Sequence, residues 1–497
     1  MKEGDLSWLV RELSGIAGDL DAEQASAPLL LAIDQGGHAS RVIAFDVHGV
    51  QHAESFTPIS TFRSGADRIE HDAREVVDSI RTALDDIAQT LGADAERVLA
   101  AGMATQRSSI VCWDRRSGKP LSPVLSWQDR RNAALVEKLR PDEDDIRRRT
   151  GLVLSPHYGA SKLRWCLDEL DEVHHARDNA RLALGPLAAY LLFCLLTERP
   201  YVVDPANASR TQLWDLATRR WSDVLGRRFG VPLELLPRVV HTRDGFGSLA
   251  FAGRDIPFAI CTGDQSAALF AFGPIERETV YLNIGTGAFL QRPADIEDPR
   301  LLHSLAYSDE QQLVAVTEGT VNGAASALDW LNERVGIDAH RAALAMKRSG
   351  AGNSSPLFIN GIGGVGSPYW CADLQSRFIG EGTEALQVQA VVESIAFLIC
   401  RNLERICSDG GVQRIRASGG LSASDYLCEC IAALSELAVE RTTLREATSL
   451  GLAFLIAGQP GNWSPPMQFE RIAPRSDDAL RDRYRRWCEE MDKRVDG

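Results

Sequence analysis

Two short segments of the chain place a glycine-rich turn directly after a strand-like run, and such turns can hold phosphate or a metal ion. The first is Asp34-Gln35-Gly36-Gly37, after the apolar run 29–33, and the second is Gly285-Thr286-Gly287, after the run 279–284. A carboxylate at a strand end can hold a hydrated metal ion, and glycine lets backbone N–H groups approach anionic oxygens without an intervening Cβ. Either turn alone is more often an ordinary turn. Together they predict a nucleotide held between two domains.

The elements that must position these turns follow a similar order in two halves of the chain. The first half has strand patterns at 29–33, 41–46 and 50–58, a helical pattern over 72–91 and a strand pattern over 98–103. The second half has strand patterns at 257–261 and 279–284, around 289 and at 313–317, and a helical pattern over 321–331. These patterns rest on apolar spacing. They indicate a weak internal repeat with a boundary between residues 250 and 274.

Four segments are therefore predicted. Residues 1–28 form an N-terminal helical extension, because apolar residues recur at helical spacing over 6–20. Residues 29–255 form the first domain and residues 256–460 form the second. Residues 461–497 form a C-terminal helical tail with a helix over 477–493.

The composition excludes several classes of protein. The chain has 497 residues, 44% of them apolar and 25% charged, which is ordinary for a globular protein. Its net charge of −14 argues against nucleic-acid or anionic-membrane partners, which need clustered lysine and arginine. The apolar stretch 182–196 is too short to span a bilayer, and residues 1–20 lack the apolar core of a signal peptide. The ten cysteines include no CxxC pair, so no zinc site is predicted and the protein is expected to be cytoplasmic.

Many ordered motifs resemble one family, the FGGY carbohydrate kinases, and most closely its glycerol kinases. The similarity extends from about residue 29 to residue 458. The matching segments are Asp34-Gln35-Gly36, Glu70-His71-Asp72, Gln106-Arg107, Trp127-Gln128-Asp129-Arg130-Arg131, Thr150-Gly151-Leu152-Val153, Lys162-Leu163-Arg164-Trp165, Asn207-Ala208-Ser209-Arg210-Thr211, Gly263-Asp264-Gln265, Gly285-Thr286-Gly287, Glu318-Gly319, Gly366-Ser367-Pro368-Tyr369-Trp370 and Ser418-Gly419-Gly420.

The resemblance implies an α/β fold with two actin-like (ribonuclease H-like) domains and a ligand cleft between them. It places the substrate side in residues 29–255 and the nucleotide side in residues 256–460. It further implies transfer of the γ-phosphoryl group of ATP to a hydroxyl, a reaction that depends on positioning and charge neutralisation. By this resemblance Asp264 is the general base that accepts the proton of the attacking hydroxyl. Asp34 would hold Mg²⁺ through water, because Mg²⁺ keeps much of its hydration shell.

The substrate site implied by the resemblance is partly altered. Arg107, Gln265 and the aromatic residues Trp127 and Phe289 match the glycerol-binding pattern. Ser108 stands where the family has a glutamate, and His157 where it has a tyrosine. A glutamate can accept bonds from two adjacent hydroxyls, whereas serine is shorter and uncharged. We therefore expect a polyol or sugar larger than glycerol.

The nucleotide site implied by the resemblance is altered as well. Its predicted residues are Gly36, Gly37, Arg41, Gly285, Thr286, Gly287, Ala325, Asp329, Gly420, Leu421 and Asp425. Gly37 and His38 replace two threonines of the glycerol kinases, Ala325 replaces a glycine, Asp329 a glutamine and Asp425 an asparagine. Backbone N–H groups do most of the binding in such loops, so these side-chain changes bear more on the phosphoryl donor and the rate than on the fold.

The leading hypothesis is an ATP-dependent kinase of a small polyol or sugar. The alternative is a catalytically weak, kinase-like protein that binds a ligand and regulates a partner, which the altered nucleotide residues would favour. A third reading, another actin-like ATPase, disagrees with the segments 207–211 and 367–370. The expected partners are the small substrate and ATP with Mg²⁺, without nucleic acid or membrane, and a homodimer or homotetramer is compatible with the sequence.

Overall fold

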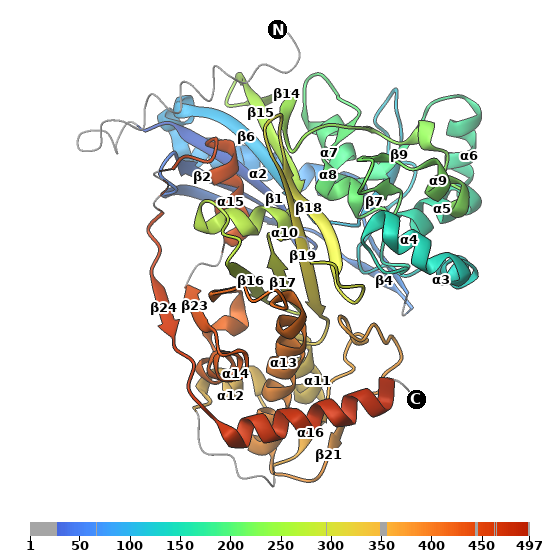
Figure 1. The fold of residues 1–497 in the computed structure, drawn as a ribbon. Helices are drawn as coiled ribbons and strands as arrows, with labels where there is room; N and C mark the ends of the chain where they lie inside the picture. Colours follow the sequence, from blue (N-terminus) through green and yellow to red (C-terminus); the bar gives the residue numbers. More distant parts are fainter. Residues whose placement is uncertain are drawn as a thin grey trace. The chain divides into compact units, whose positions relative to one another are not determined.

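The computed structural model describes residues 27–65, 67–294, 296–347, 355–442, 446–461, 463 and 465–495. The helix predicted over residues 6–20 lies outside the described residues. Contacts between residues divide the chain into two compact units (Figure 1). The first comprises residues 1–274, 304–315 and 446–466, and the second comprises residues 275–303, 316–445 and 467–497.

These units differ from the predicted domain boundaries in two places. The predicted boundary at 255/256 falls inside strand β15 (Arg254–Gly263), which is hydrogen-bonded within the sheet of the first unit, so that unit continues to Pro274. Helix α15 (Ala447–Ile456), predicted to belong to the second domain, contacts strands of the first unit. In both places the segment belongs to the unit whose sheet it pairs with or packs on. Its position along the sequence does not show this.

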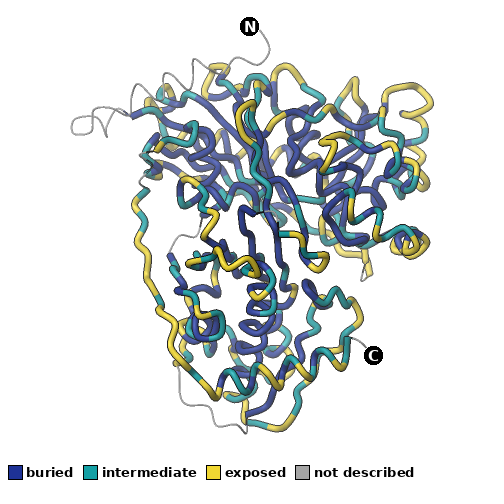
Figure 2. The backbone as a smooth tube through the Cα atoms, viewed as in Figure 1, coloured by how far each residue is buried: buried dark blue, intermediate teal, exposed yellow. Residues whose placement is uncertain are grey.

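The first unit is built on a six-stranded sheet. In spatial order its strands are β14 (Arg243–Phe251), β15, β6 (Val98–Thr105), β1 (Leu29–Gln35), β2 (Ala39–Asp46) and β3 (Gln51–Pro58). The central strands β1 and β6 are buried over nearly their whole length (Figure 2). Their continuous apolar sequence, without polar alternation, is typical of strands covered on both faces.

A long amphipathic helix packs on this sheet. Helix α2 (Ala73–Leu91) contacts β2 and β3, and its buried side includes Val76, Ile80, Leu84 and Ile87. Asp72 caps the helix by accepting hydrogen bonds from the backbone N–H groups of two residues of its first turn, a frequent way to begin a helix. The helix predicted over 72–91 is thus confirmed.

The rest of the first unit is made of shorter elements. A five-stranded sheet has the order β4 (Phe62–Ser64), β5 (Arg68–His71), β8 (Val124–Leu125), β7 (Ile110–Asp114) and β9 (Leu182–Pro186). Two strand pairs are β10 (Val202–Val203) with β13 (Arg238–Val239) and β11 (Trp214–Asp215) with β12 (Arg220–Trp221). The remaining helices are α3 (Ala133–Lys138), α4 (Glu143–Thr150), α5 (Gly159–Glu169), α6 (Asp171–Asp178), α7 (Leu187–Leu195), α8 (Pro205–Ser209), α9 (Asp223–Phe229) and α10 (Asp264–Ala268), with 3₁₀ turns η1 (Gly92–Arg97), η2 (Arg140–Asp142), η3 (Leu233–Leu235) and η4 (Leu269–Phe272).

The second unit holds most of a seven-stranded sheet, whose residues 304–308 and 313–315 are assigned to the first unit. Its order is β18 (Leu302–Ser308), β19 (Leu313–Val321), β17 (Ala288–Arg292), β16 (Thr279–Ile284), β22 (Arg414–Ser418), β23 (Ala438–Thr442) and β24 (Phe469–Ile472). A small sheet pairs β20 (Leu357–Ile359) with β21 (Arg377–Ile379). The helices are α11 (Ala325–Val335), α12 (Ala339–Ala345), α13 (Glu384–Ile406), α14 (Asp425–Ser435) and α16 (Asp478–Val495), with the 3₁₀ turn η5 (Gly420–Ala423).

Helix α13 is the core helix of the second unit. Among the described residues it is the one helix long and apolar enough to cross a membrane by length and composition, and 83% of its apolar window is buried (Figure 2). A mostly buried helix of this kind is typical of a protein core. Helix α16 packs beside it through Trp487 and Met491, so the predicted C-terminal helix is present.

The two main sheets repeat one pattern of strand pairing. In the order β3-β2-β1-β6-β15-β14, successive pairs are antiparallel, antiparallel, parallel, parallel and antiparallel. The order β19-β17-β16-β22-β23-β24 has the same series. This confirms the internal repeat and the ribonuclease H-like fold class. The second repeat begins at β16, however, because the run 257–261 belongs to β15 of the first sheet.

One predicted helix is displaced. The pattern over 321–331 placed a helix start at Val321, but β19 continues to Val321 and α11 begins at Ala325. The backbone N–H of Ala325 donates to the carbonyl of Gly285, which ties the helix start to the second glycine turn. The cleft predicted between the domains stays a prediction.

Candidate active site

The ends of three neighbouring strands bring the predicted chemical groups of the first unit together. Strands β1, β6 and β15 run parallel, and Thr105 of β6 is in register with Gln35 of β1 and Gly263 of β15. Parallel α/β sheets commonly bind ligands at the carboxyl ends of their strands. The predicted metal ligand, the predicted arginine and the predicted base all lie at these ends.

Arg107 and the predicted base Asp264 lie next to each other. Arg107 Nε is 3.9 Å from Asp264 Oδ1, and the side chain of Asp264 keeps 27% of its surface exposed. Gly263 makes this possible, because a Cβ at that position would lie 2.5 Å from Cγ of Arg107. The backbone N–H of Gln265 donates to Asp264 Oδ1 at 2.7 Å. This carboxylate is therefore held in place, near a guanidinium and open to solvent.

Asp34 lies at the same strand ends in an unusual electrostatic setting. Burial raises the pKa of Asp34 to about 7, the nearby charge of Asp264 raises it further, and Arg41 acts in the opposite direction. Two carboxylates this close repel each other when both are ionised. A cation between or beside them would relieve that repulsion.

The first glycine turn is held by side-chain amides. The backbone N–H of Gly36 donates to the carbonyl of Ala39 at 3.0 Å, and the carbonyl of Gly36 accepts from Gln35 Nε2 at 2.7 Å and Gln106 Nε2 at 3.2 Å. A Cβ on Gly37 would lie 3.7 Å from Trp127 Nε1, so the turn adjoins this indole ring.

Arg41, predicted to bind the nucleotide, already has partners. Its guanidinium pairs with Glu54 at 3.1 Å and with Glu446, and it lies over the ring of Phe56. These contacts hold α15 close to β2 and β3. The predicted nucleotide role of Arg41 stays a prediction.

Ser108, Trp127 and His157 form a second group beside Arg107. Ser108 has a positive φ of 67° and is partly exposed. Trp127 keeps 39% of its surface exposed, so its ring can lie against the carbons of a ligand. His157 Nδ1 is 3.1 Å from the carbonyl oxygen of Trp127. His157 and Trp127 therefore lie next to each other, and the role of the three residues in substrate binding stays a prediction.

The hydrogen bond of His157 decides which ring nitrogen carries the proton. A carbonyl oxygen can only accept, so Nδ1 must donate. Burial lowers the pKa of His157 to about 4, the charges of Lys162 and Arg130 lower it further, and the Trp127 carbonyl and Asp129 raise it. The ring is therefore neutral near pH 7, and Nε2 is left as a hydrogen-bond acceptor.

The remaining predicted residues lie in the second unit, where the other glycine turn adjoins the start of α11. The carbonyl of Thr286 accepts from the N–H groups of Ala324 and Ser326, and Gly285 N–H donates to the carbonyl of Gly287. A Cβ on Gly287 would lie 2.8 Å from the carbonyl oxygen of Val321, so this position requires glycine. A glycine turn at a helix start is suited to phosphate.

The predicted nucleotide carboxylates in this unit are both engaged. Asp329, on α11, is bound to His340 Nε2 at 2.7 Å. Asp425, at the start of α14, is bound to Arg441 at 2.5 Å. Gly420 is open, with no atom within 4 Å of an added Cβ, and Leu421 is buried. Ala325 is the first residue of α11.

Phe289, grouped with the substrate residues by sequence, is placed on β17 of the second unit and is partly exposed. The first unit thus gathers the residues predicted for metal, base and most of the substrate site, together with three of the predicted nucleotide residues. These are Asp34, Gly36, Gly37, Arg41, Arg107, Ser108, Trp127, His157, Asp264 and Gln265. The second unit carries Phe289 and the other nucleotide residues.

Several residues that shape these sites were not predicted. Gly263 makes room for Arg107, and Gly419, with φ of 88°, passes so close to Ile284 that a Cβ would lie 2.6 Å from its carbonyl oxygen. Both glycines stood inside segments that matched the family. Lys162, buried on α5, was also inside such a segment, and a charged residue at a buried helical position could have marked it.

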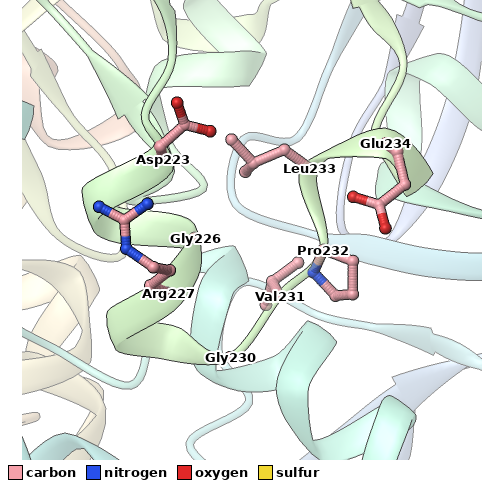
Figure 3. Close-up of a pocket in the computed structure, with 8 residues that line it drawn as sticks. All are labelled: Asp223, Gly226, Arg227, Gly230, Val231, Pro232, Leu233 and Glu234. Carbon is pink, nitrogen blue, oxygen red and sulfur yellow. The ribbon is translucent and has the colours of Figure 1, made fainter.

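A separate surface pocket contains none of the predicted residues. It is formed by α9 and the following loop and is lined by Asp223, Gly226, Arg227, Gly230, Val231, Pro232, Leu233 and Glu234 (Figure 3). The charged side chains of Asp223, Arg227 and Glu234 lie around the apolar residues 231–233. The pocket is thus separate from the pair of Arg107 and Asp264 at the strand ends. We assign it no part in the reaction.

Comparison with known families decides the identity. Residues 29–271 match the N-terminal domain, and residues 280–458 the C-terminal domain, of the FGGY family of carbohydrate kinases. The chain belongs to this family. As an FGGY kinase it is an ATP-dependent enzyme that phosphorylates a carbohydrate or polyol.

Individual relatives agree. The chain is 31% identical to a glycerol kinase of Rhodospirillum centenum over 461 residues, covering 90% of this chain and 92% of the relative. It is 32% identical to a glycerol kinase of a Geobacter species over 442 residues, covering 86% and 89%.

Solved structures of FGGY kinases share the fold. A Plasmodium falciparum glycerol kinase crystallised with ADP aligns with a TM-score of 0.83 at 22% identity, covering 94% of this chain and 98% of the other. A xylulose kinase of Rhodospirillum rubrum aligns with a TM-score of 0.79 at 20% identity, covering 94% and 98%. These structures support the two-domain actin-like fold.

The donor set of this FGGY kinase fits a hydrated divalent metal ion. Asp34 is partly exposed at a strand end beside a second carboxylate. Within the described part of the chain, no three His, Cys, Asp or Glu side chains converge as a metal site. Such a site suits a divalent cation that takes many of its ligands from water and from substrate phosphates.

Proposed function

We propose that this FGGY kinase transfers the γ-phosphoryl group of ATP to a hydroxyl of a polyol or ketose with four or more carbons. The observation that carries this proposal is the grouping of Arg107 and Asp264 beside an exposed Trp127 and an acceptor nitrogen of His157. An ion pair beside an aromatic surface suits a ligand with hydroxyls on one side and carbons on the other.

Asp264 serves as the general base in this proposal. Its carboxylate is held by the N–H of Gln265 and is partly exposed, so an incoming hydroxyl can reach it. It accepts the hydroxyl proton as the bond to phosphorus forms, while Arg107 donates to neighbouring hydroxyls and orients the acceptor.

The phosphate groups are bound by the glycine turns and a metal ion. Asp34 would hold Mg²⁺, which neutralises phosphate charge when bound. The backbone N–H groups of Gly36 and Gly285 already donate within their turns, so those of Gly37, Thr286 and Gly287 would face phosphate oxygens. Gly420, Leu421 and Asp425 would adjoin the adenosine.

The substrate class follows from the altered pocket. Without a glutamate at position 108, glycerol loses an acceptor for two adjacent hydroxyls. Nε2 of His157 supplies a hydrogen-bond acceptor at a different place in the pocket. The tyrosine of the family could also have donated a hydrogen bond there. A longer substrate can place a hydroxyl beside His157 and also fill the space beside Ser108. A three-carbon substrate is too short to reach both places.

The test is a panel of three- to six-carbon polyols and ketoses with ATP and Mg²⁺, followed through ADP release. We expect glycerol to be a poor acceptor and at least one longer compound to be better. Efficient phosphorylation of glycerol, with the longer compounds inert, would refute the substrate class. Turnover of none of them would favour the alternative of a ligand-binding regulator, which the comparisons do not support.

A further inference from the structure

Lys162 lies in the Lys162-Leu163-Arg164-Trp165 segment, to which the reaction assigns no role. It is on helix α5, and none of its surface is exposed. Its ammonium nitrogen donates to the carbonyl of Ser108 at 2.9 Å and to the carbonyl of Ser126 at 2.8 Å. A buried lysine is rare unless it has partners, and here both partners are backbone oxygens of two different loops.

Each of these loops carries residues of the proposed acceptor site. Ser108 follows Arg107, and its positive φ makes it a residue whose conformation needs outside support. Ser126 precedes Trp127, whose exposed ring would lie against the acceptor. Lys162 thus joins the loop of the arginine to the loop of the tryptophan.

A second tie runs parallel to the first. The hydroxyl of Ser109 donates to Gln106 Oε1 at 2.8 Å and accepts from the N–H of Trp127 at 2.9 Å. We call Lys162 Nζ and Ser109 Oγ together the loop brace. Packing alone would not need a lysine here, because an uncharged side chain of the same length would fill the same buried space at a lower desolvation cost. The lysine instead satisfies two buried carbonyls.

We propose that Lys162 is a positioning residue for the acceptor site, holding the Arg107–Ser108 loop and the Ser126–Trp127 loop at a fixed separation. The inference rests on the proposed function, because it assigns these loops to the acceptor. The second glycine turn lies in the other unit, outside the loop brace. The first glycine turn accepts from Gln106, so it is linked to the brace through that side chain. Loss of Lys162 should therefore weaken acceptor binding more than nucleotide binding.

The kinetic test compares Lys162→Met with Lys119→Met, in which an exposed lysine paired with Glu172 is removed. With the best acceptor from the panel, Lys162→Met should raise the acceptor KM by about tenfold or more, as expected for loss of hydrogen bonds to two carbonyls. The KM for ATP should stay within about twofold, and Lys119→Met should match the wild type. An unchanged acceptor KM, or equal increases in both KM values, would overturn the inference.

A second readout needs no substrate. Amide hydrogen exchange in peptides covering residues 106–109 and 126–128 should be faster in Lys162→Met than in the wild type, with the sheet strands unchanged. Faster exchange there would support the loop brace even if the wild type phosphorylated no acceptor, so failure of the proposed function remains distinguishable. Unchanged exchange would overturn the brace. If Lys162→Met does not fold, Ser109→Ala tests the other tie, and it must raise the acceptor KM for the inference to stand.

Discussion

The buried ammonium of Lys162 should make the free energy of unfolding rise with pH above neutrality. The substitution Lys162→Met should remove this dependence. Burial lowers the pKa of Lys162 from 10.5 to about 7, the charge of Arg131 lowers it further, and Asp129 and Cys166 oppose the shift. One pKa unit corresponds to about 1.4 kcal/mol, so keeping the charged form in its site costs on the order of 4–5 kcal/mol.

The sign follows from proton binding. Below pH 7 the lysine is protonated in both the folded and the unfolded chain, and the full cost of the buried charge is present. Between pH 7 and pH 10.5 the unfolded chain binds more protons, so the free energy of unfolding rises with pH. From pH 7 to pH 9 this contribution amounts to about 2 kcal/mol. Lys162→Met lacks the titrating group and should lack the rise.

Two assays measure the effect. In the first, the urea midpoint of the wild type minus that of Lys162→Met is determined at pH 7 and pH 9, and the difference should grow in favour of the wild type. Lys119→Met serves as the control and should show no such change. In the second, NMR of ¹³Cε-labelled lysine should reveal one of the six lysines of the chain titrating near pH 7, and its signal should disappear in Lys162→Met. Six lysines that all titrate near their usual pKa would refute the reasoning.

Three further predictions concern the site and the second unit. Asp264→Asn keeps the size of the side chain but cannot take a proton, so kcat should fall by at least about 10²-fold while ATP binding, measured by calorimetry, persists; near-normal turnover would remove Asp264 from the role of base. Ser108→Glu should shift the ratio of kcat/KM values toward glycerol by about 1–3 kcal/mol, the size of a charged hydrogen bond, and an unchanged ratio would make Ser108 a tolerated substitution. Arg483→Met leaves Glu393 buried without its ion-pair partner, since both side chains are 1% exposed, and should lower the free energy of unfolding by about 3–5 kcal/mol in urea titrations; a loss below about 1 kcal/mol would contradict this.

Local sequence patterns predicted the helices and strands in which buried apolar residues recur at a regular spacing. Strands β1 and β16 and helix α2 were predicted because a central strand is continuously apolar and a helix on a sheet is apolar at a spacing of three to four residues. The start of α11 was predicted wrongly, because apolar spacing continues through Val321 although the backbone there is still in a strand. The true start depends on a hydrogen bond to Gly285, which lies 40 residues earlier along the chain.

The domain boundaries show a limit of the same kind. Nothing local distinguishes the run 257–261 from the opening strand of a second domain. Its membership in the first sheet is decided by pairing with β6, and α15 returns to the first unit after the whole second sheet has been formed. Such pairings join segments far apart in the chain, so no short segment encodes them.

The sequence by itself determined the chemical inventory of this protein: a carboxylate at each of two strand ends, an arginine after a third strand, two glycine turns and a family-wide order of motifs. Only the tertiary structure decided how these groups can act. Strand register brings the carboxylates and the arginine to one edge, the Trp127 carbonyl decides the proton position on His157, and Lys162 spans two loops. The physical reason is that residue type decides what a side chain can donate, accept or bury, whereas its partners are decided by backbone segments far apart in the chain.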